Sequence, residues 1–101
     1  MQTQMHLRIH AVLAIMALLA CYWFSVAPWE WVAVILCIGL VAGMEIMNTA
    51  VEYVVNLVSP EFHPLAGKAK DAAAGAVLVA ALAALAVGLR IFGPKLISLL
   101  T

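Results

Sequence analysis

The sequence contains little charge. Only 10% of its 101 residues are Asp, Glu, Lys or Arg, and five basic residues balance five acidic ones. This balance argues against a basic nucleic-acid-binding protein, and 67% hydrophobic residues exclude a disordered chain. Mean hydropathy is +1.14, and a soluble domain this small has too little interior for so much apolar surface. We therefore predict one integral-membrane domain over residues 1–101.

Cysteine is also scarce. Cys21 and Cys37 each lie in an apolar run, without the spacing of a metal site or a disulfide scaffold, so we expect them to be packing residues. Residues 18–21 loosely resemble a lipoprotein cleavage site. Hydrophobicity continues to Ala27, however, whereas a cleaved segment is followed by a polar mature chain. A spanning helix is the preferred interpretation.

Three apolar stretches have the length of about 20 residues that a membrane-spanning helix needs. The predicted spans are residues 10–27, 29–58 and 65–91. Pro28 and Ser59-Pro60 mark the two turns, and Gly93-Pro94 is expected to break or kink the third helix. The sequence predicts an all-α membrane protein. Arg8, Lys68 and Lys70 on one side, against Arg90 and Lys95 on the other, weakly favour a cytoplasmic N-terminus and second turn.

Small residues recur at every fourth position of the third stretch: Ala72, Ala76, Ala80, Ala84 and Gly88. Small residues at this spacing let helix backbones approach closely in lipid, which favours a tight helix–helix interface. The alternative is that alanine is simply common in this chain.

The second stretch carries polar residues on one face: Glu45, Asn48, Glu52 and Asn56. At about 100° per residue they fall within roughly 80° of one another. Glu45 lies about 21 Å along the helix from Trp31, inside a hydrocarbon core of about 30 Å, whereas Asn56 reaches the headgroups. A charge at the bilayer centre costs roughly 2.5–3.5 kcal/mol, which favours a functional role. Pairing with Lys68, Lys70 or Arg8 to fix the helices is the alternative.

The second turn adds complementary groups: Glu61, Phe62, His63, Lys70 and Asp71. Carboxylates bind Mg²⁺, a lysine neutralises phosphate oxygens, and a carboxylate near a hydroxyl acts as a general base. These are the groups that phosphoryl transfer requires. The sequence has no Walker A or protein-kinase glycine-rich loop, so the site must be built differently.

The run from Glu45 to Glu52, the Glu-x-His turn, Ala-Lys-Asp and the alanine-rich helix resemble the small bacterial lipid kinases, the prokaryotic diacylglycerol and undecaprenol kinases. Leu7-Arg8-Ile9-His10 is similar to the stretch before their first span. The resemblance implies a homotrimeric bundle with three membrane helices per chain in the bacterial cytoplasmic membrane. It also implies phosphorylation of a lipid alcohol, undecaprenol or diacylglycerol, by ATP with Mg²⁺.

The resemblance further implies a role for each matching residue. Glu45 and Asn48 would be catalytic, Glu52 would bind the metal, Glu61, Phe62, His63, Lys70 and Asp71 would contact ATP, and Arg8 with Glu45 would meet the lipid. Three features differ from the family pattern. The sequence begins at Met1 without the usual amphipathic helix, Asn56 replaces a common aspartate, and Gln4 stands where many members have a second metal-binding carboxylate. An amide binds Mg²⁺ more weakly than a carboxylate.

A second hypothesis is a non-enzymatic membrane subunit, either proton-conducting or an assembly factor, because an acid within a small helical hairpin is also typical of proton carriers. It explains Glu45 and leaves Asn48, Glu61, His63 and Lys70 without roles. Between the two lipids, the stretch from Asp71 to Leu78 is more similar to the undecaprenol-kinase branch.

Overall fold

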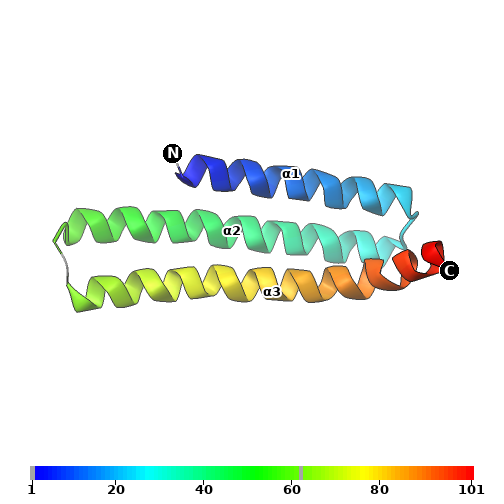
Figure 1. Cartoon of the computed structure of the whole chain (residues 1–101). Coiled ribbons are helices and arrows are strands. Elements are labelled where there is room, and N and C mark those ends of the chain that lie inside the picture. The colour runs from blue at the N-terminus through cyan, green and yellow to red at the C-terminus, as the bar shows by residue number, and fades with distance from the viewer. Residues whose placement is uncertain (1, 62) are drawn as a thin grey trace.

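The computed structural model is a bundle of three long helices, 56 × 22 × 21 Å in extent (Figure 1). It describes the backbone of residues 2–61 and 63–101 and the side chains of residues 8–61 and 63–101. The helices are α1 (Gln2–Trp23), α2 (Pro28–Val58) and α3 (Pro64–Leu100). The all-α class predicted from the sequence is confirmed.

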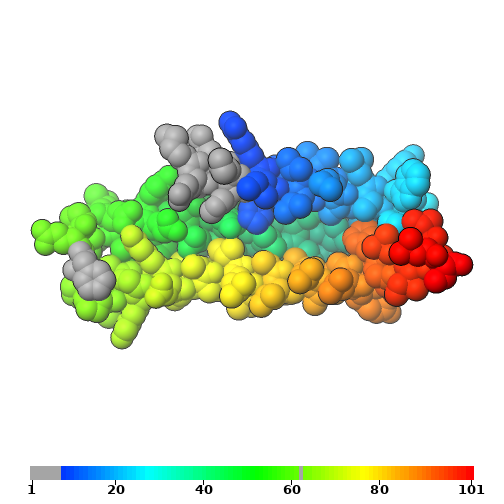
Figure 2. Space-filling view, viewed as in Figure 1, coloured from blue at the N-terminus to red at the C-terminus, as the bar shows by residue number. Residues whose placement is uncertain are grey.

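Helix α2 is the centre of the bundle. It lies between α1 and α3 in Figure 1 and packs against both, whereas the backbones of α1 and α3 stay apart along the described residues. In the space-filling view, atoms of α2 remain visible between those of α1 and α3 (Figure 2). One face of α2 is therefore left open between its two neighbours.

Helix α1 ends at Trp23, four residues before the predicted end of the first span. Ser25 takes a left-handed conformation with φ of 51°. Its amide N–H donates to the carbonyl of Tyr22, and the N–H of Val26 donates to that of Cys21, at 3.2 Å each. This is the Schellman arrangement, in which the residue two past the cap also makes an apolar contact. Val26 and Cys21 are both buried in one cluster.

Helix α2 begins at Pro28, which suits a first helical position because proline has no N–H to leave unpaired. Two residues later, Glu30 turns back and accepts a hydrogen bond from the N–H of Ala27 at 2.8 Å. The same carboxylate accepts from Lys95 of α3 at 3.2 Å. Glu30 is buried, so one side chain both caps α2 and ties the end of α3 to it.

Helix α3 begins at Pro64, with His63 as its cap: the Nδ1 of His63 accepts from the N–H of Leu65 at 3.1 Å. Of the break or kink predicted at Gly93-Pro94, the structure shows the kink: the helix is not interrupted and continues to Leu100. Figure 1 shows the last turns leaving the line of the helix, because Pro94 removes a backbone hydrogen bond and its ring crowds the preceding turn. Lys95 holds this terminal segment against Glu30.

The buried core is small, and the apolar surface is large. Cys21, Val26, Val34 and Ile91 form one cluster near the first turn, with the rings of Phe24 and Phe92 6.1 Å apart beside it. Most large apolar side chains along all three helices are exposed. Helices α2 and α3 are each long and apolar enough to cross a membrane, and residues Arg8–Trp23 form a shorter apolar helix. These features agree with a membrane protein, since such a surface is unfavourable in water.

The small-residue stripe of α3 does not form a single face. Ala80 is buried, Ala84 and Gly88 are half-buried, and Ala72 and Ala76 are exposed. Four residues turn a helix by about 400°, so each step of the stripe moves about 40° around the axis. Only the middle and later members therefore take part in the packing of the bundle.

We expect Ala80→Leu to destabilise the chain by about 1–3 kcal/mol, because it forces a larger side chain between α3 and α2. Thermal unfolding in a mild detergent measures this. Ala83→Leu is the matched control, since Ala83 is exposed on the same helix. Equal unfolding midpoints for the two variants would contradict the assigned packing face.

We expect Glu30→Ala to lower the unfolding midpoint more than Glu30→Gln does. Glutamine keeps an oxygen that accepts from the N–H of Ala27 and loses only the charge facing Lys95, whereas alanine loses both contacts. The same detergent melts provide the measurement. A midpoint for Glu30→Ala equal to that of the unchanged chain would show that the pair does not hold the helix ends.

Candidate functional site

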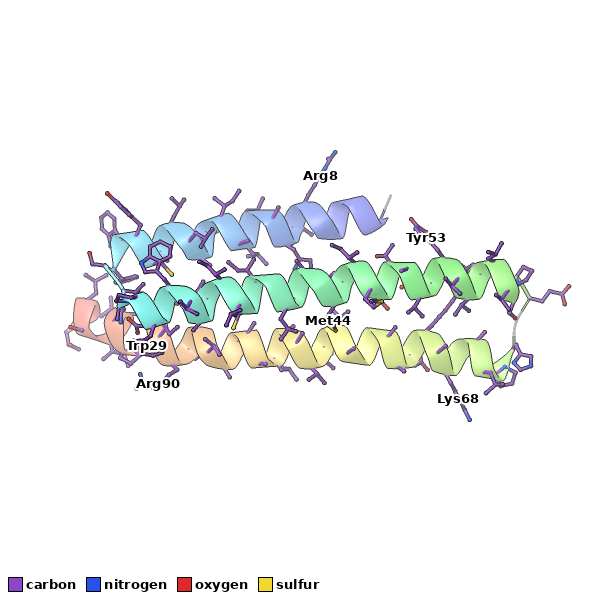
Figure 3. The ribbon with its side chains drawn as sticks, turned by 180° about the vertical axis from the view of Figure 1, so that it is seen from behind. Arg8, Trp29, Met44, Tyr53, Lys68 and Arg90 are labelled. Atoms are coloured by element: carbon purple, nitrogen blue, oxygen red, sulfur yellow. The ribbon has the colours of Figure 1, made fainter. Side chains whose placement is uncertain are left out.

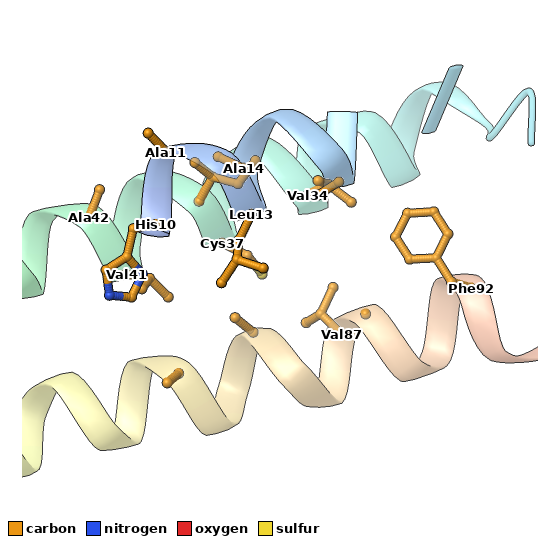
Figure 4. A pocket seen from close by; sticks show the side chains of 15 residues that line it. His10, Ala11, Leu13, Ala14, Val34, Cys37, Val41, Ala42, Val87 and Phe92 are labelled. Atoms are coloured by element: carbon orange, nitrogen blue, oxygen red, sulfur yellow. The ribbon is translucent and has the colours of Figure 1, made fainter. Parts of the chain in front are cut away.

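The open face of α2 forms the floor of an apolar groove of about 520 Å³. Its walls come from α1 and α3, and its floor is mainly Val34, Cys37, Ile38, Val41 and Ala42. Figure 4 shows His10 beside Val41 at one end of the groove and Phe92 at the other. Small residues of α3, Ala81, Ala84 and Gly88, keep the groove wide.

The floor of the groove and the predicted polar stripe share one face of α2. Val34, Ile38 and Val41 point in the same direction as Glu45, Asn48, Glu52 and Asn56, all within about 80° at 100° per residue. Along this face the helix changes from apolar to polar between Val41 and Glu45, only about 6 Å apart along the axis. The groove therefore leads directly to a row of hydrogen-bonding groups, here called the polar row: Glu45, Asn48, Glu52 and Asn56.

Glu45 is the first polar group beyond the groove. Its Oε1 lies 3.2 Å from the Nε2 of His10 on α1. The two side chains are only 15% and 29% exposed, so the contact is largely shielded from solvent. Thr49 donates to the backbone carbonyl of Glu45 at 3.1 Å. Among the described side chains, this carboxylate pairs with none of Lys68, Lys70 and Arg8. The alternative in which one of these cations pairs with Glu45 to fix the helices is therefore not observed.

Asn48 and Glu52 lie together one and two turns further along α2. The Nδ2 of Asn48 donates to Oε1 of Glu52 at 3.1 Å. The Oδ1 of Asn48 is buried and has no hydrogen-bond partner among the described residues. A buried acceptor without a partner is uncommon, so this oxygen is a candidate contact for a bound group. The Glu52 side chain is exposed beside it.

Asn56 and Lys70 join the polar ends of α2 and α3. The Nζ of Lys70 donates to Oδ1 of Asn56 at 2.7 Å. Lysine has three donor hydrogens, so two remain available for another acceptor. Lys68 extends away from the bundle (Figure 3). Of the two lysines, only Lys70 is directed to the polar face of α2.

The remaining predicted site residues are less closely grouped. Glu61 and Asp71 are exposed, and His63 caps α3 through its Nδ1. Arg8 points away from the bundle in Figure 3. The Gln4 side chain and Phe62 lie outside the described residues, so their predicted roles remain predictions. Within the described part, no group of three metal-ligating His, Cys, Asp or Glu side chains is present.

Two contacts were not foreseen from the sequence. His10 was noted only as part of a similar stretch, and the signal that identifies it is a histidine within an apolar helix, which requires a polar partner. Lys95 was considered only for membrane orientation and Glu30 was not singled out, yet the two form an ion pair at the opposite end of the bundle. Glutamate at the third position of the helix, two residues after Pro28, is the signal for the cap.

The chain is similar in sequence to known proteins. The family model described as prokaryotic diacylglycerol kinase matches residues 1–92. An undecaprenol kinase from Bacillus subtilis is 41% identical over 95 residues, covering 94% of this chain and 77% of that protein. A diacylglycerol kinase from Synechocystis sp. is 40% identical over 99 residues, 97% of this chain and 57% of that protein.

A diacylglycerol kinase from Escherichia coli is 36% identical over 77 residues, 76% of this chain and 63% of that protein. The chain thus spans less than two thirds of the length of two of these three relatives. The family match covers both the groove and the polar face of α2. This chain belongs to the prokaryotic diacylglycerol kinase family, a family of lipid kinases.

Proposed function

We propose that the chain phosphorylates a membrane lipid alcohol, undecaprenol or diacylglycerol, with ATP. The observation that carries this proposal is the continuity of the apolar groove with the polar row on one face of α2. A lipid alcohol needs both surfaces, an apolar one for its chain and a polar one for its hydroxyl. With the hydrocarbon chain in the groove, the hydroxyl lies near Glu45.

Glu45 is proposed as the general base, and Asn48 supports it within the polar row. The carboxylate takes the proton as the lipid oxygen forms its bond to the γ-phosphorus and the bond to the leaving ADP breaks. Lys70 neutralises phosphate charge with the donors not used by Asn56. Glu61, Phe62, His63 and Asp71 are proposed to contact the nucleotide, and Arg8 to lie near the lipid entrance.

The residues present fit a magnesium ion that arrives with ATP. Glu52 offers an exposed carboxylate beside the Oδ1 of Asn48, which has no partner in the part of the chain that the structure describes. Mg²⁺ is commonly held by one or two carboxylates together with substrate phosphates, so no larger cluster of acids is required. When bound, the ion neutralises phosphate charge. Gln4 is a weaker candidate ligand because it is an amide.

A homotrimer with three membrane helices per chain is proposed for the assembly, in the bacterial cytoplasmic membrane with the polar row on the cytoplasmic side. One chain leaves most of its apolar surface uncovered and supplies few acids to the site. Neighbouring copies would cover part of that surface. The non-enzymatic alternative, a proton-conducting or assembly subunit, is not favoured, because the relatives are named as kinases.

The decisive experiment is a phosphoryl-transfer assay on the full chain in lipid vesicles, with undecaprenol and diacylglycerol tested side by side. We expect Mg-ATP to phosphorylate at least one of them, Glu45→Gln to lower turnover by roughly 100- to 10,000-fold, and Glu52→Gln to abolish it. Glu30→Gln, the same chemical change at the other end of the bundle, is the control, assayed below its unfolding temperature. Absence of product from both lipids overturns the proposal, and full turnover by Glu52→Gln removes the metal assignment.

We expect Lys70→Met to lower kcat/KM for ATP by about 10- to 100-fold, the effect of losing one hydrogen bond to a charged group. Lys68→Met is the matched control and should behave as the unchanged chain, because Lys68 extends away from the bundle. ATP titrations at saturating lipid measure both variants. Equal losses from the two lysines would indicate a general charge effect rather than a phosphate contact at Lys70.

A further inference from the structure

His10 links α1 to the polar row of α2. Among the described residues, its contact with Glu45 is the only side-chain hydrogen bond between these two helices, and it joins positions 35 residues apart. The same imidazole lines the end of the apolar groove, as Figure 4 shows. His10 therefore touches both the proposed base and the surface proposed for the lipid chain.

The direction of this hydrogen bond follows from its chemistry. When Glu45 is ionised, as a general base must be, its carboxylate has only acceptors, so the imidazole nitrogen facing Oε1 carries the hydrogen. The second oxygen, Oε2, makes no hydrogen bond within the described part of the chain. Holding one oxygen fixes the plane of the carboxylate and leaves the other free to accept a proton.

No other charged group competes for His10 in its described surroundings. On α1, the Arg8 side chain points away from the bundle (Figure 3). On α2, the next acid is Glu52, about 10 Å beyond Glu45 along the axis. On α3, residues 72–89 contain no charged side chain, and those that line the groove are small or apolar. Glu45 is thus the one acid in contact with the imidazole.

We propose that His10 is the positioning residue of Glu45. Its Nε2–H holds Oε1 and so orients Oε2 toward the end of the groove, where the lipid hydroxyl would be deprotonated. This role rests on the proposed function, because it requires Glu45 to act as the base. With this role for His10, helix α1 contributes to the reaction as well as forming one wall of the groove.

The test compares His10→Phe with His10→Gln in the vesicle assay. Phenylalanine keeps an aromatic ring and loses the donor, whereas the glutamine side chain restores an N–H donor of similar reach. We expect His10→Phe to lower kcat by up to about 100-fold, the cost of a misplaced reacting group, with an unchanged KM for ATP. His10→Gln should recover most of that loss. Detergent melts run in parallel report any change in stability.

A second readout does not require turnover. The infrared carboxylate band of Glu45, identified by difference from Glu45→Gln, should shift in His10→Phe and stay near its original position in His10→Gln. A His10→Phe variant that is as active as the unchanged chain overturns the proposal. The proposal is also overturned if His10→Phe loses kcat together with a lowered unfolding midpoint and His10→Gln does not restore kcat. That result would show that the contact only stabilises the fold.

The two proposals fail in different ways. If the unchanged chain phosphorylates neither lipid while the Glu45 band still shifts in His10→Phe, the kinase proposal is overturned and the contact is supported. If the chain is an active kinase and neither the band nor kcat responds to His10→Phe, the kinase proposal stands and the positioning role is overturned.

Discussion

The arrangement of the molecule depends on one face of α2 that neither neighbouring helix covers. Because the backbones of α1 and α3 stay apart, this face is at once the floor of an apolar groove and, further along, the row formed by Glu45, Asn48 and Glu52. On the polar part of this face, Glu45 contacts His10 of α1, and Asn56 accepts a hydrogen bond from Lys70 of α3.

The buried cluster and the polar row lie toward opposite ends of the bundle. Near the first turn, Cys21, Val26 and Ile91 are buried together, and Glu30 with Lys95 ties the end of α3 to the start of α2. Toward the opposite end, no described residue between 35 and 79 is classed as buried, and the Oδ1 of Asn48 has no partner among the described residues. A fixed end beside an open polar end suits a membrane enzyme, because substrate and nucleotide need access only at one boundary of the lipid.

The two acids of the polar row, Glu45 and Glu52, differ in their exposure to solvent. Glu45 is largely shielded and is held by a hydrogen bond, whereas Glu52 is exposed. The two acids therefore have different surroundings although they share one helix face. A shielded acid beside an apolar groove suits proton transfer from a lipid hydroxyl, and an exposed acid suits an ion that arrives with ATP.

The sequence by itself determined the three helices, the end of α2 at Ser59-Pro60 and the common face of Glu45 and Glu52, because hydropathy, proline and a period of 3.6 residues are local properties. The end of α1 at Trp23 is also local, since the left-handed Ser25 and the hydrogen bond from Val26 to Cys21 set it. Only the tertiary structure decided that α3 stays helical beyond Pro94 and that Glu30 pairs with Lys95. The His10–Glu45 contact belongs to the same group. These features depend on which faces of separate helices meet, and no local pattern along one chain encodes the distance between residues 35 or 65 positions apart.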